Sequence, residues 1–140
     1  MIQLAGPDDF EALAALAGQL GYPSTASQVS ERMAAMPVGE HRVWLARVDG
    51  RVLGWIHAYV ARHVVIDPLV EIGGLVVSED ARGQGVGPQL LDATYAWARE
   101  LGCAQVGVHS NVVRADAHRF YEREGFTLEK RQGVFTRRVG

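Results

Sequence analysis

The sequence is poor in lysine and in cysteine. Lys130 is the only lysine, although lysine and arginine together number 14, and Cys103 is the only cysteine. A P-loop needs a lysine directly after its glycines, so the position of Lys130, beside Glu129, excludes that class of nucleotide-binding site. A single cysteine excludes an internal disulfide and is compatible with a reducing compartment, so we expect a cytoplasmic protein.

An excess of positive charge and a long apolar run are also missing. The net charge is −2 at pH 7, which argues against a nucleic-acid partner because such a partner calls for a basic face. The N-terminus has no basic stretch followed by an apolar one, and charged residues and a proline interrupt the apolar residues 52–70. We therefore expect no signal peptide and no membrane partner. No cluster of His, Cys and Asp has metal-ligand spacing, so we expect no metal.

What the sequence does contain is typical of one globular domain over residues 1–140. Hydrophobic residues make up 48% and charged residues 21% of the chain. The apolar periodicity predicts the element order β-α-α-β-β-β-α-β-α-β-β, in which hairpin strands come first and a β-α-β unit follows. This order predicts a mixed α/β (α+β) fold, with helices covering a mixed sheet.

Local signals mark several element ends. Thr25 and Gln28 form a capping-box pattern at the start of a predicted second helix. Asp49 and Gly50 predict the tight turn of a hairpin. Near the end of the chain, "FTLEK" and "VFTRR" alternate in polarity and predict two final strands.

A glycine-rich turn joins a strand dense in β-branched residues to a predicted helix that begins near Pro88. Its glycines are Gly83, Gly85 and Gly87, preceded by Arg82. A dinucleotide-binding fold wants Gly-x-Gly-x-x-Gly after the first strand, and neither the spacing nor the place fits. An Arg-x-x-Gly-x-Gly turn before a helix instead presents bare main-chain amides to an anion. A tight turn without any ligand is the alternative.

Two stretches carry a family resemblance. "EIGGLVVSEDARGQGVGPQLLDATYAWARELG" and "HSNVVRADAHRFYEREGF" lie, with the strand between them, in residues 71–126. They resemble the acetyl-CoA-binding core of the GCN5-related N-acetyltransferase (GNAT) superfamily. The resemblance implies a mostly antiparallel sheet of six to seven strands, about four helices and a splayed strand pair that holds the cofactor. It also implies transfer of an acetyl group from acetyl-CoA to a primary amine of a small molecule or peptide, by direct attack in a ternary complex, and is compatible with a homodimer.

The resemblance assigns the cofactor-binding residues by position. In the family, a bulge splays the strand before the turn, and the exposed main chain of that strand binds the pantetheine arm. The matching main-chain positions are Leu75, Val76 and Val77. The matching pyrophosphate cradle consists of Arg82, Gly83, Gln84, Gly85, Val86, Gly87 and Pro88. Further contacts fall on Asn111, Arg114 and Phe120. Pro88 departs from the family pattern and removes one amide donor, Asn111 also suits a turn, and Phe120 also suits the core.

The resemblance also suggests two catalytic residues. Tyr121 matches the tyrosine that many members place near the thioester sulfur, where a phenol of pKa ~10 protonates the departing thiolate. Glu71 matches a strand glutamate that acts as general base, and period-2 geometry places it on one strand face with Gly73 and Leu75. His109 is the second candidate for the base, and His57 and His63 are weaker ones. The structural alternatives are a half-buried tyrosine and a solvated glutamate at the end of a strand.

The sequence says least about the acceptor. Residues that could line its pocket, although each also suits the core, are Tyr22, Trp44, Trp55 and His57. No acidic cluster marks a cleft for a polyamine or an aminoglycoside. Two other functions stay open: a regulatory module that binds acetyl-CoA without turnover, and a structural interaction domain.

Overall fold

Five strands form one sheet in the order β1-β2-β3-β4-β5. In this computed structural model, which describes residues 1–110 and 115–140, the strands are β1 (Ile2–Leu4), β2 (His41–Val48), β3 (Arg51–Ala61), β4 (Leu69–Val77) and β5 (Val106–Val108). The pairs β1–β2, β2–β3 and β3–β4 are antiparallel, and β5 runs parallel to β4. The mixed, mostly antiparallel sheet is confirmed, although the described residues contain fewer strands than the expected six to seven.

The helices follow the expected order. They are α1 (Phe10–Leu20), α2 (Ala26–Ala34), α3 (Val86–Leu101) and α4 (Ala115–Arg123), and short 3₁₀ turns at Pro7–Asp9 and Glu79–Ala81 precede α1 and α3. The chain divides into two units, Met1–Val108 and His109–Gly140. The first holds the sheet with α1, α2 and α3, and the second holds α4.

The local sequence signals form the structures that they predict. The Thr25 hydroxyl accepts from the Gln28 amide at 3.1 Å, and the Gln28 side chain accepts from the Thr25 amide at 3.0 Å, which is the predicted capping box. Asp49 and Gly50 adopt positive φ angles of 49° and 77° at the hairpin tip, the conformation that a tight two-residue hairpin turn requires.

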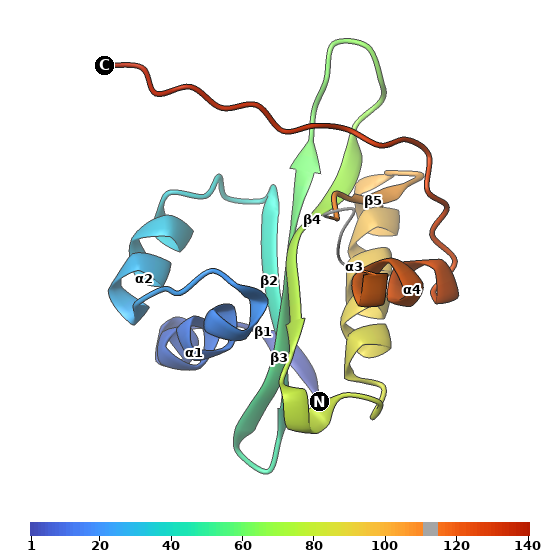
Figure 1. The fold of residues 1–140 in the computed structure, drawn as a ribbon. Helices are drawn as coiled ribbons and strands as arrows, with labels where there is room; N and C mark the ends of the chain where they lie inside the picture. The colour runs from blue at the N-terminus through green and yellow to red at the C-terminus, as the bar shows by residue number, and fades with distance from the viewer. Residues whose placement is uncertain (111–114) are drawn as a thin grey trace. The chain divides into compact units, whose positions relative to one another are not determined.

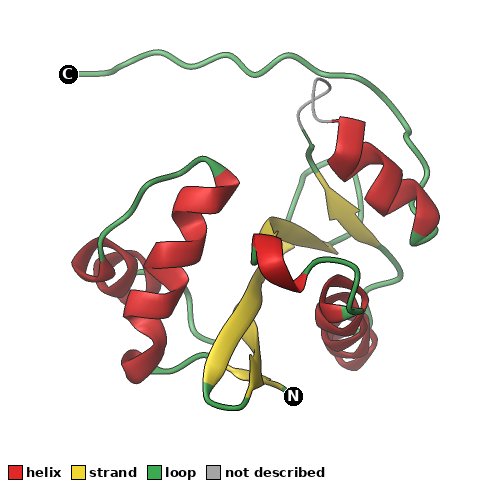
Figure 2. Cartoon of the chain, turned by 60° about the horizontal axis from the view of Figure 1, so that its bottom comes forward, coloured by secondary structure: helices red, strands yellow, loops and turns green. Residues whose placement is uncertain are grey.

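In the first unit, helices cover both faces of the sheet. Figure 1 shows α1 and α2 on one face and α3 on the other, and Figure 2 shows the strands between them. On the α3 face, Ala58 and Val70 pack with Trp97 and Ala98 in a buried cluster. On the α1 face, the indole nitrogen of Trp55 donates to the Leu13 carbonyl at 3.1 Å. Alternate residues of β3 therefore belong to two different layers.

Helix α3 buries one stripe of its surface. Leu90, Thr94, Trp97 and Ala98 are buried, whereas Leu101 is 42% exposed because it is the last residue of the helix. Gly102 ends the helix in the left-handed conformation, which glycine adopts without strain.

The two predicted C-terminal strands are wrong: the structure has no regular secondary structure from residue 126 to residue 140. An alternating sequence becomes a strand only where a partner pairs with it, and here none does among the described residues. Among the described residues, no helix is both long and apolar enough to cross a bilayer.

Candidate functional site

A β-bulge interrupts the pairing of β3 and β4. His57 pairs with Gly74 and Ala58 pairs with Ile72, so Gly73 is the extra residue on β4. The bulge reverses the alternation of side chains, because one added residue moves every later side chain to the opposite face. Glu71 therefore lies on the α1 face with its partner Tyr59, whereas Leu75 lies on the α3 face with Ile56. The prediction that Glu71 and Leu75 share a face is wrong for this reason.

Beyond the bulge, no strand in the described part of the chain pairs with β4 on the side of β5, which leaves β4 a free edge there. The two strands pair only at Val70, Glu71 and Ile72 of β4, and β5 ends at Val108. The Ser78 amide donates to the Leu53 carbonyl on β3 at 2.7 Å. Because main-chain groups alternate in direction along a strand, Leu75 and Val77 direct theirs away from β3, toward the free edge.

The main chain of Val76 is directed the other way, toward β3. A Cβ added at Gly54 would lie 2.7 Å from the Val76 carbonyl oxygen, which places that oxygen against β3. Of the three main-chain positions named from the sequence, the structure thus brings Leu75 and Val77 to the free edge of the strand and turns Val76 away from it.

The free edge leads into the glycine turn, which we define as residues 82–88. Gly83 and Gly85 adopt φ angles of +78° and +81°, and Gly85 is the N-cap residue of α3. Both positions favour glycine, because side chains rarely adopt this conformation. No side chain caps α3 at this end, and Arg82 is exposed and without a hydrogen bond or ion pair among the described residues. The first amides of α3 are therefore free to bind an anion.

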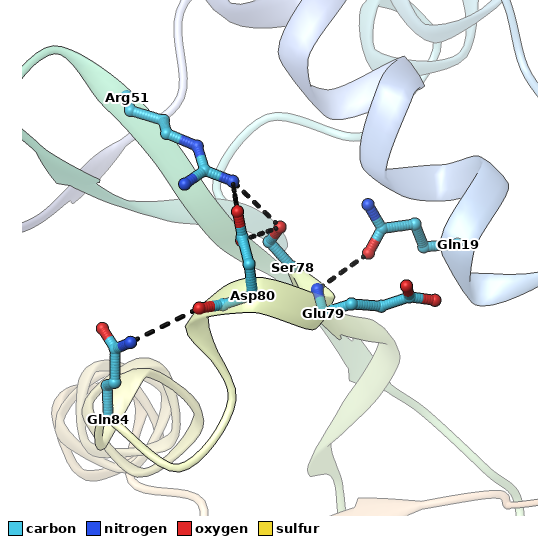
Figure 3. A network of polar contacts seen from close by, with 6 residues as sticks. All are labelled: Gln19, Arg51, Ser78, Glu79, Asp80 and Gln84. Carbon is cyan, nitrogen blue, oxygen red and sulfur yellow. Dashed lines mark hydrogen bonds and ion pairs between the residues drawn. The ribbon is translucent and has the colours of Figure 1, made fainter.

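A polar network holds the approach to this turn (Figure 3). Arg51 on β3 donates to both carboxylate oxygens of Asp80 at 2.7 Å, and the Ser78 hydroxyl donates to Asp80 at 2.7 Å. Gln19 of α1 accepts from the Glu79 amide at 3.1 Å. The hydrogen bonds from Arg51 and Ser78 lower the pKa of the Asp80 carboxyl, and the Asp80 carboxylate raises the pKa of Arg51.

A second cluster lies on the α1 face beside the bulge. It consists of His41, His57, Tyr59 and Glu71, which we call the histidine cluster. The Nδ1 of His41 and the Nε2 of His57 are 2.9 Å apart, and the Tyr59 hydroxyl donates to Glu71 Oε2 at 3.1 Å. Burial, more than the Glu71 charge, raises the pKa of Tyr59. Burial and the neighbouring His41 lower the pKa of His57 to about 4.

Sequence reasoning named Glu71 and His57 but missed His41 and Tyr59 as members of this cluster. Of the other predicted acceptor residues, Trp55 packs against α1 and Tyr22 is 70% exposed. Trp44 lies on the opposite face, where its ring meets Trp97 edge-on at 5.8 Å. The register of β2 and β3, which brings His41 beside Tyr59, is the signal that would have revealed the cluster.

The second unit carries Tyr121 and Phe120 on α4. The Tyr121 ring lies edge-on to Phe120 at 5.2 Å and to Phe126 at 5.3 Å. Tyr121 and Phe120 are half-buried, and His109 is exposed. Asn111 and Arg114 lie outside the described residues. Among the residues that are described, no group of three or more His, Cys, Asp or Glu side chains could hold a metal ion.

Comparisons with known proteins agree on one family. The family model described as the acetyltransferase (GNAT) family matches residues 11–126. An aminoglycoside N(6′)-acetyltransferase type 1 of Stenotrophomonas maltophilia is 31% identical over 96% of this chain and 90% of its own length. An aminoalkylphosphonate N-acetyltransferase of Salmonella typhimurium is 40% identical, but the match spans 59% of this chain and only 54% of that protein.

Solved structures show the same fold. An apo aminoglycoside 6′-N-acetyltransferase from Acinetobacter haemolyticus matches with a TM-score of 0.88 at 19% identity, over 100% of this chain and 99% of that one. An aminoglycoside N-acetyltransferase in complex with CoA matches with a TM-score of 0.82 at 21% identity, over 99% and 100%. The extent of the family match and the near full-length relative together show that this chain belongs to the GNAT acetyltransferase family.

Proposed function

We propose that residues 1–140 form one N-acetyltransferase domain that moves an acetyl group from acetyl-CoA to a primary amine. The acceptor is a small molecule or a peptide, and the amine attacks directly in a ternary complex. Membership of the GNAT family and relatives that are named as N-acetyltransferases support this proposal. They do not favour the alternative of a regulatory module without turnover.

One observation carries the proposal: the free edge of β4 runs directly into the uncapped N-terminus of α3. An extended amide-bearing chain can pair with the main chain of Leu75 and Val77, as a neighbouring strand would. At the end of that edge, the bare amides of the glycine turn suit a pair of phosphates. A pantetheine arm followed by a pyrophosphate has this order of groups, so the residues present fit CoA.

The glycine turn supplies the phosphate contacts in this proposal. A Cβ at Gly83 would meet no other atom within 4 Å, so the space beside it is open to a ligand. Arg82 adds a positive charge. The amide N–H groups of Val86 and Gly87 lie in the first turn of α3, whereas Pro88 has no backbone N–H to donate. The proposal also includes the cofactor contacts that the family resemblance implies for Asn111, Arg114 and Phe120.

The thioester of bound acetyl-CoA supplies the acyl group. Glu71 attracts the acceptor ammonium and receives a proton from it through a water molecule, because its carboxylate lies on the α1 face, two residues before the bulge at Gly73. Its hydrogen bond from Tyr59 holds it in place. Tyr121 gives its phenolic proton to the departing thiolate as general acid.

Acetyl transfer from acetyl-CoA to a panel of amines tests the proposal. The panel contains small amines, amino acids, aminoglycosides, aminoalkylphosphonates and peptides, and the released thiol is measured. We expect turnover with at least one class, and thermal stabilisation by acetyl-CoA of about 2.7 kcal/mol at 100 times its dissociation constant. Stabilisation by acetyl-CoA without turnover on any amine would instead indicate a binding module. The absence of both stabilisation and turnover would contradict both functions.

A further inference from the structure

Two histidines on neighbouring strands are joined by a hydrogen bond. His41 of β2 and His57 of β3 stack with ring centroids 5.1 Å apart, and His41 Nδ1 lies 2.9 Å from His57 Nε2. A hydrogen bond between two neutral imidazoles uses the proton of one ring and the lone pair of the other. The tautomers of the two rings are therefore coupled: when His57 Nε2 donates, its Nδ1 is a free acceptor and His41 carries its proton on Nε2.

The inner end of this pair is the Nδ1 of His57, which lies at the bulge of β4. A Cβ added at Gly73 would stand 2.6 Å from this atom, so the imidazole occupies the space that a side chain would need. Gly73 itself is exposed, although Glu71 and Ile72 directly before it are buried. A small molecule can thus reach the bulge, at the point where the free edge of β4 begins.

The outer end of the pair is His41, which lines a surface groove with Met33, Met36 and Val43. This groove lies between the end of α2 and the start of β2, and it is open to solvent. The two imidazoles therefore connect the bulge of β4, across β3, with the solvent in the groove beside β2.

We propose that His57 and His41 form a proton relay that carries one proton from the acceptor amine at the bulge to solvent beside α2. The inference rests on the proposed function and adds a second proton acceptor beside Glu71. An ammonium must lose two protons to become an amide nitrogen. When CoA leaves as a thiol, the net reaction releases one proton to water, and the relay provides its route.

The relay moves protons in three transfers. An N–H bond of the acceptor breaks, its electron pair stays on nitrogen, and the proton binds His57 Nδ1. The proton on His57 Nε2 passes to His41 Nδ1, and the proton on His41 Nε2 passes to water. Both rings are neutral before and after the step. After the product leaves, His57 Nδ1 gives its proton to water that enters at the exposed bulge, and His41 Nε2 takes a proton from water beside α2, which restores the first tautomer.

The surroundings of His57 suit transfer of a proton rather than its retention. The rings of His41 on β2 and Tyr59 on β3 lie beside it, and Glu71 on β4 accepts a hydrogen bond from Tyr59. From α1, the apolar Leu20 lies beside Gly74, the strand partner of His57. Burial and His41 keep His57 neutral at pH 7 by lowering its pKa to about 4. A neutral imidazole has the lone pair that the step requires, and a low pKa lets the proton leave again quickly.

Nitrogen-15 NMR of the wild-type imidazoles tests the geometry without any assay of activity. We expect His57 to be neutral from pH 6 to pH 8, with its proton on Nε2, and its pKa to rise in His41→Phe, since His41 helps to lower it. A proton held on Nδ1 of His57, or a His57 pKa that does not respond to His41→Phe, would overturn the relay even if the enzyme is active.

Kinetics test the step itself. We expect His57→Gln to lower kcat by about 10²-fold with unchanged affinity for CoA, and imidazole added to His57→Ala to restore part of the rate. His41→Phe, which keeps a ring stacked on Tyr59, should lower kcat less and change the pH profile. His118→Gln is the matched control, because His118 lies on α4, outside the histidine cluster, and has no assigned role in the reaction. Wild-type kcat in a folded His57→Gln protein would overturn the relay, whereas failure of the proposed function would abolish turnover in the wild type as well.

Discussion

The carbonyl oxygen of Val76 lies 2.7 Å from the point that a Cβ on Gly54 would occupy. Strands β3 and β4 approach closely here because β3 has no side chain at this position, and Val86 of α3 lies 3.2 Å from the same point. This contact fixes the end of β4 from which the glycine turn departs.

We expect Gly54→Ala to destabilise the protein by about 1–3 kcal/mol, because a backbone oxygen cannot move aside as the end of a side chain can. Urea unfolding at pH 7 measures the change. The matched control is Gly18→Ala in α1, where a Cβ meets no atom within 4 Å. That substitution should stabilise the protein by about 0.5–1 kcal/mol. Equal stability of Gly54→Ala and the wild type would contradict the close approach of the two strands.

Gly85→Ala should weaken CoA binding as well as stability. The φ angle of +81° at Gly85 puts strain on any side chain, at about 1–2 kcal/mol, and the strain reorients the amides that begin α3. Gly39→Ala is the control, because Gly39 has a similar φ of +84° and no atom within 4 Å of its Cβ position. Both variants should lose similar stability, and only Gly85→Ala should lose affinity for CoA in calorimetry. Equal losses of affinity would contradict a role of the turn in binding.

Asp80→Asn should lower stability in a pH-dependent way. The folded protein lowers the pKa of Asp80 below its ordinary value of 3.8, so the carboxylate stabilises the fold above that value. This contribution is lost as the pH falls through the lowered pKa. Urea unfolding should therefore separate the variant from the wild type at pH 7 and not at about pH 2. The difference should also shrink in high salt, because Arg51 and Asp80 are exposed. A difference in unfolding free energy between Asp80→Asn and the wild type that persists at low pH would show that the ion pair is not its cause.

Tyr121→Phe should lower kcat by about 10²-fold and leave the affinity for CoA unchanged, because the phenol acts only on the departing thiolate. Steady-state kinetics over a range of pH and calorimetry with CoA separate the two effects. Phenylalanine keeps the ring that packs edge-on against Phe120 and Phe126. Turnover that is unchanged across the pH range would exclude Tyr121 as the acid.

Sequence patterns predict this fold well where the governing chemistry is local. The capping box of Thr25 and Gln28 and the turn at Asp49 and Gly50 depend on neighbours within three residues, and both form as expected. The glycine turn belongs to this class too, because its conformation follows from Gly83 and Gly85.

Features that depend on strand register are harder to predict. The sequence shows a glycine pair in β4 but not which glycine bulges, and Gly73 alone decides that Glu71 and Leu75 face opposite layers. His41 and His57 lie 16 positions apart and meet only through the pairing of β2 with β3. The prediction of two C-terminal strands was wrong for the same kind of reason, because an alternating sequence favours a strand but does not show whether another strand pairs with it.

In the proposed function, the bare amides of the glycine turn bind the pyrophosphate of CoA. This binding is measured by calorimetric titration of the wild-type protein with CoA, and then with pantetheine, which lacks the pyrophosphate together with the phosphoadenosine. We expect heat and saturable binding with CoA, weaker binding as salt increases, and a much lower affinity for pantetheine. No heat with CoA, or equal affinities for CoA and pantetheine, would contradict it.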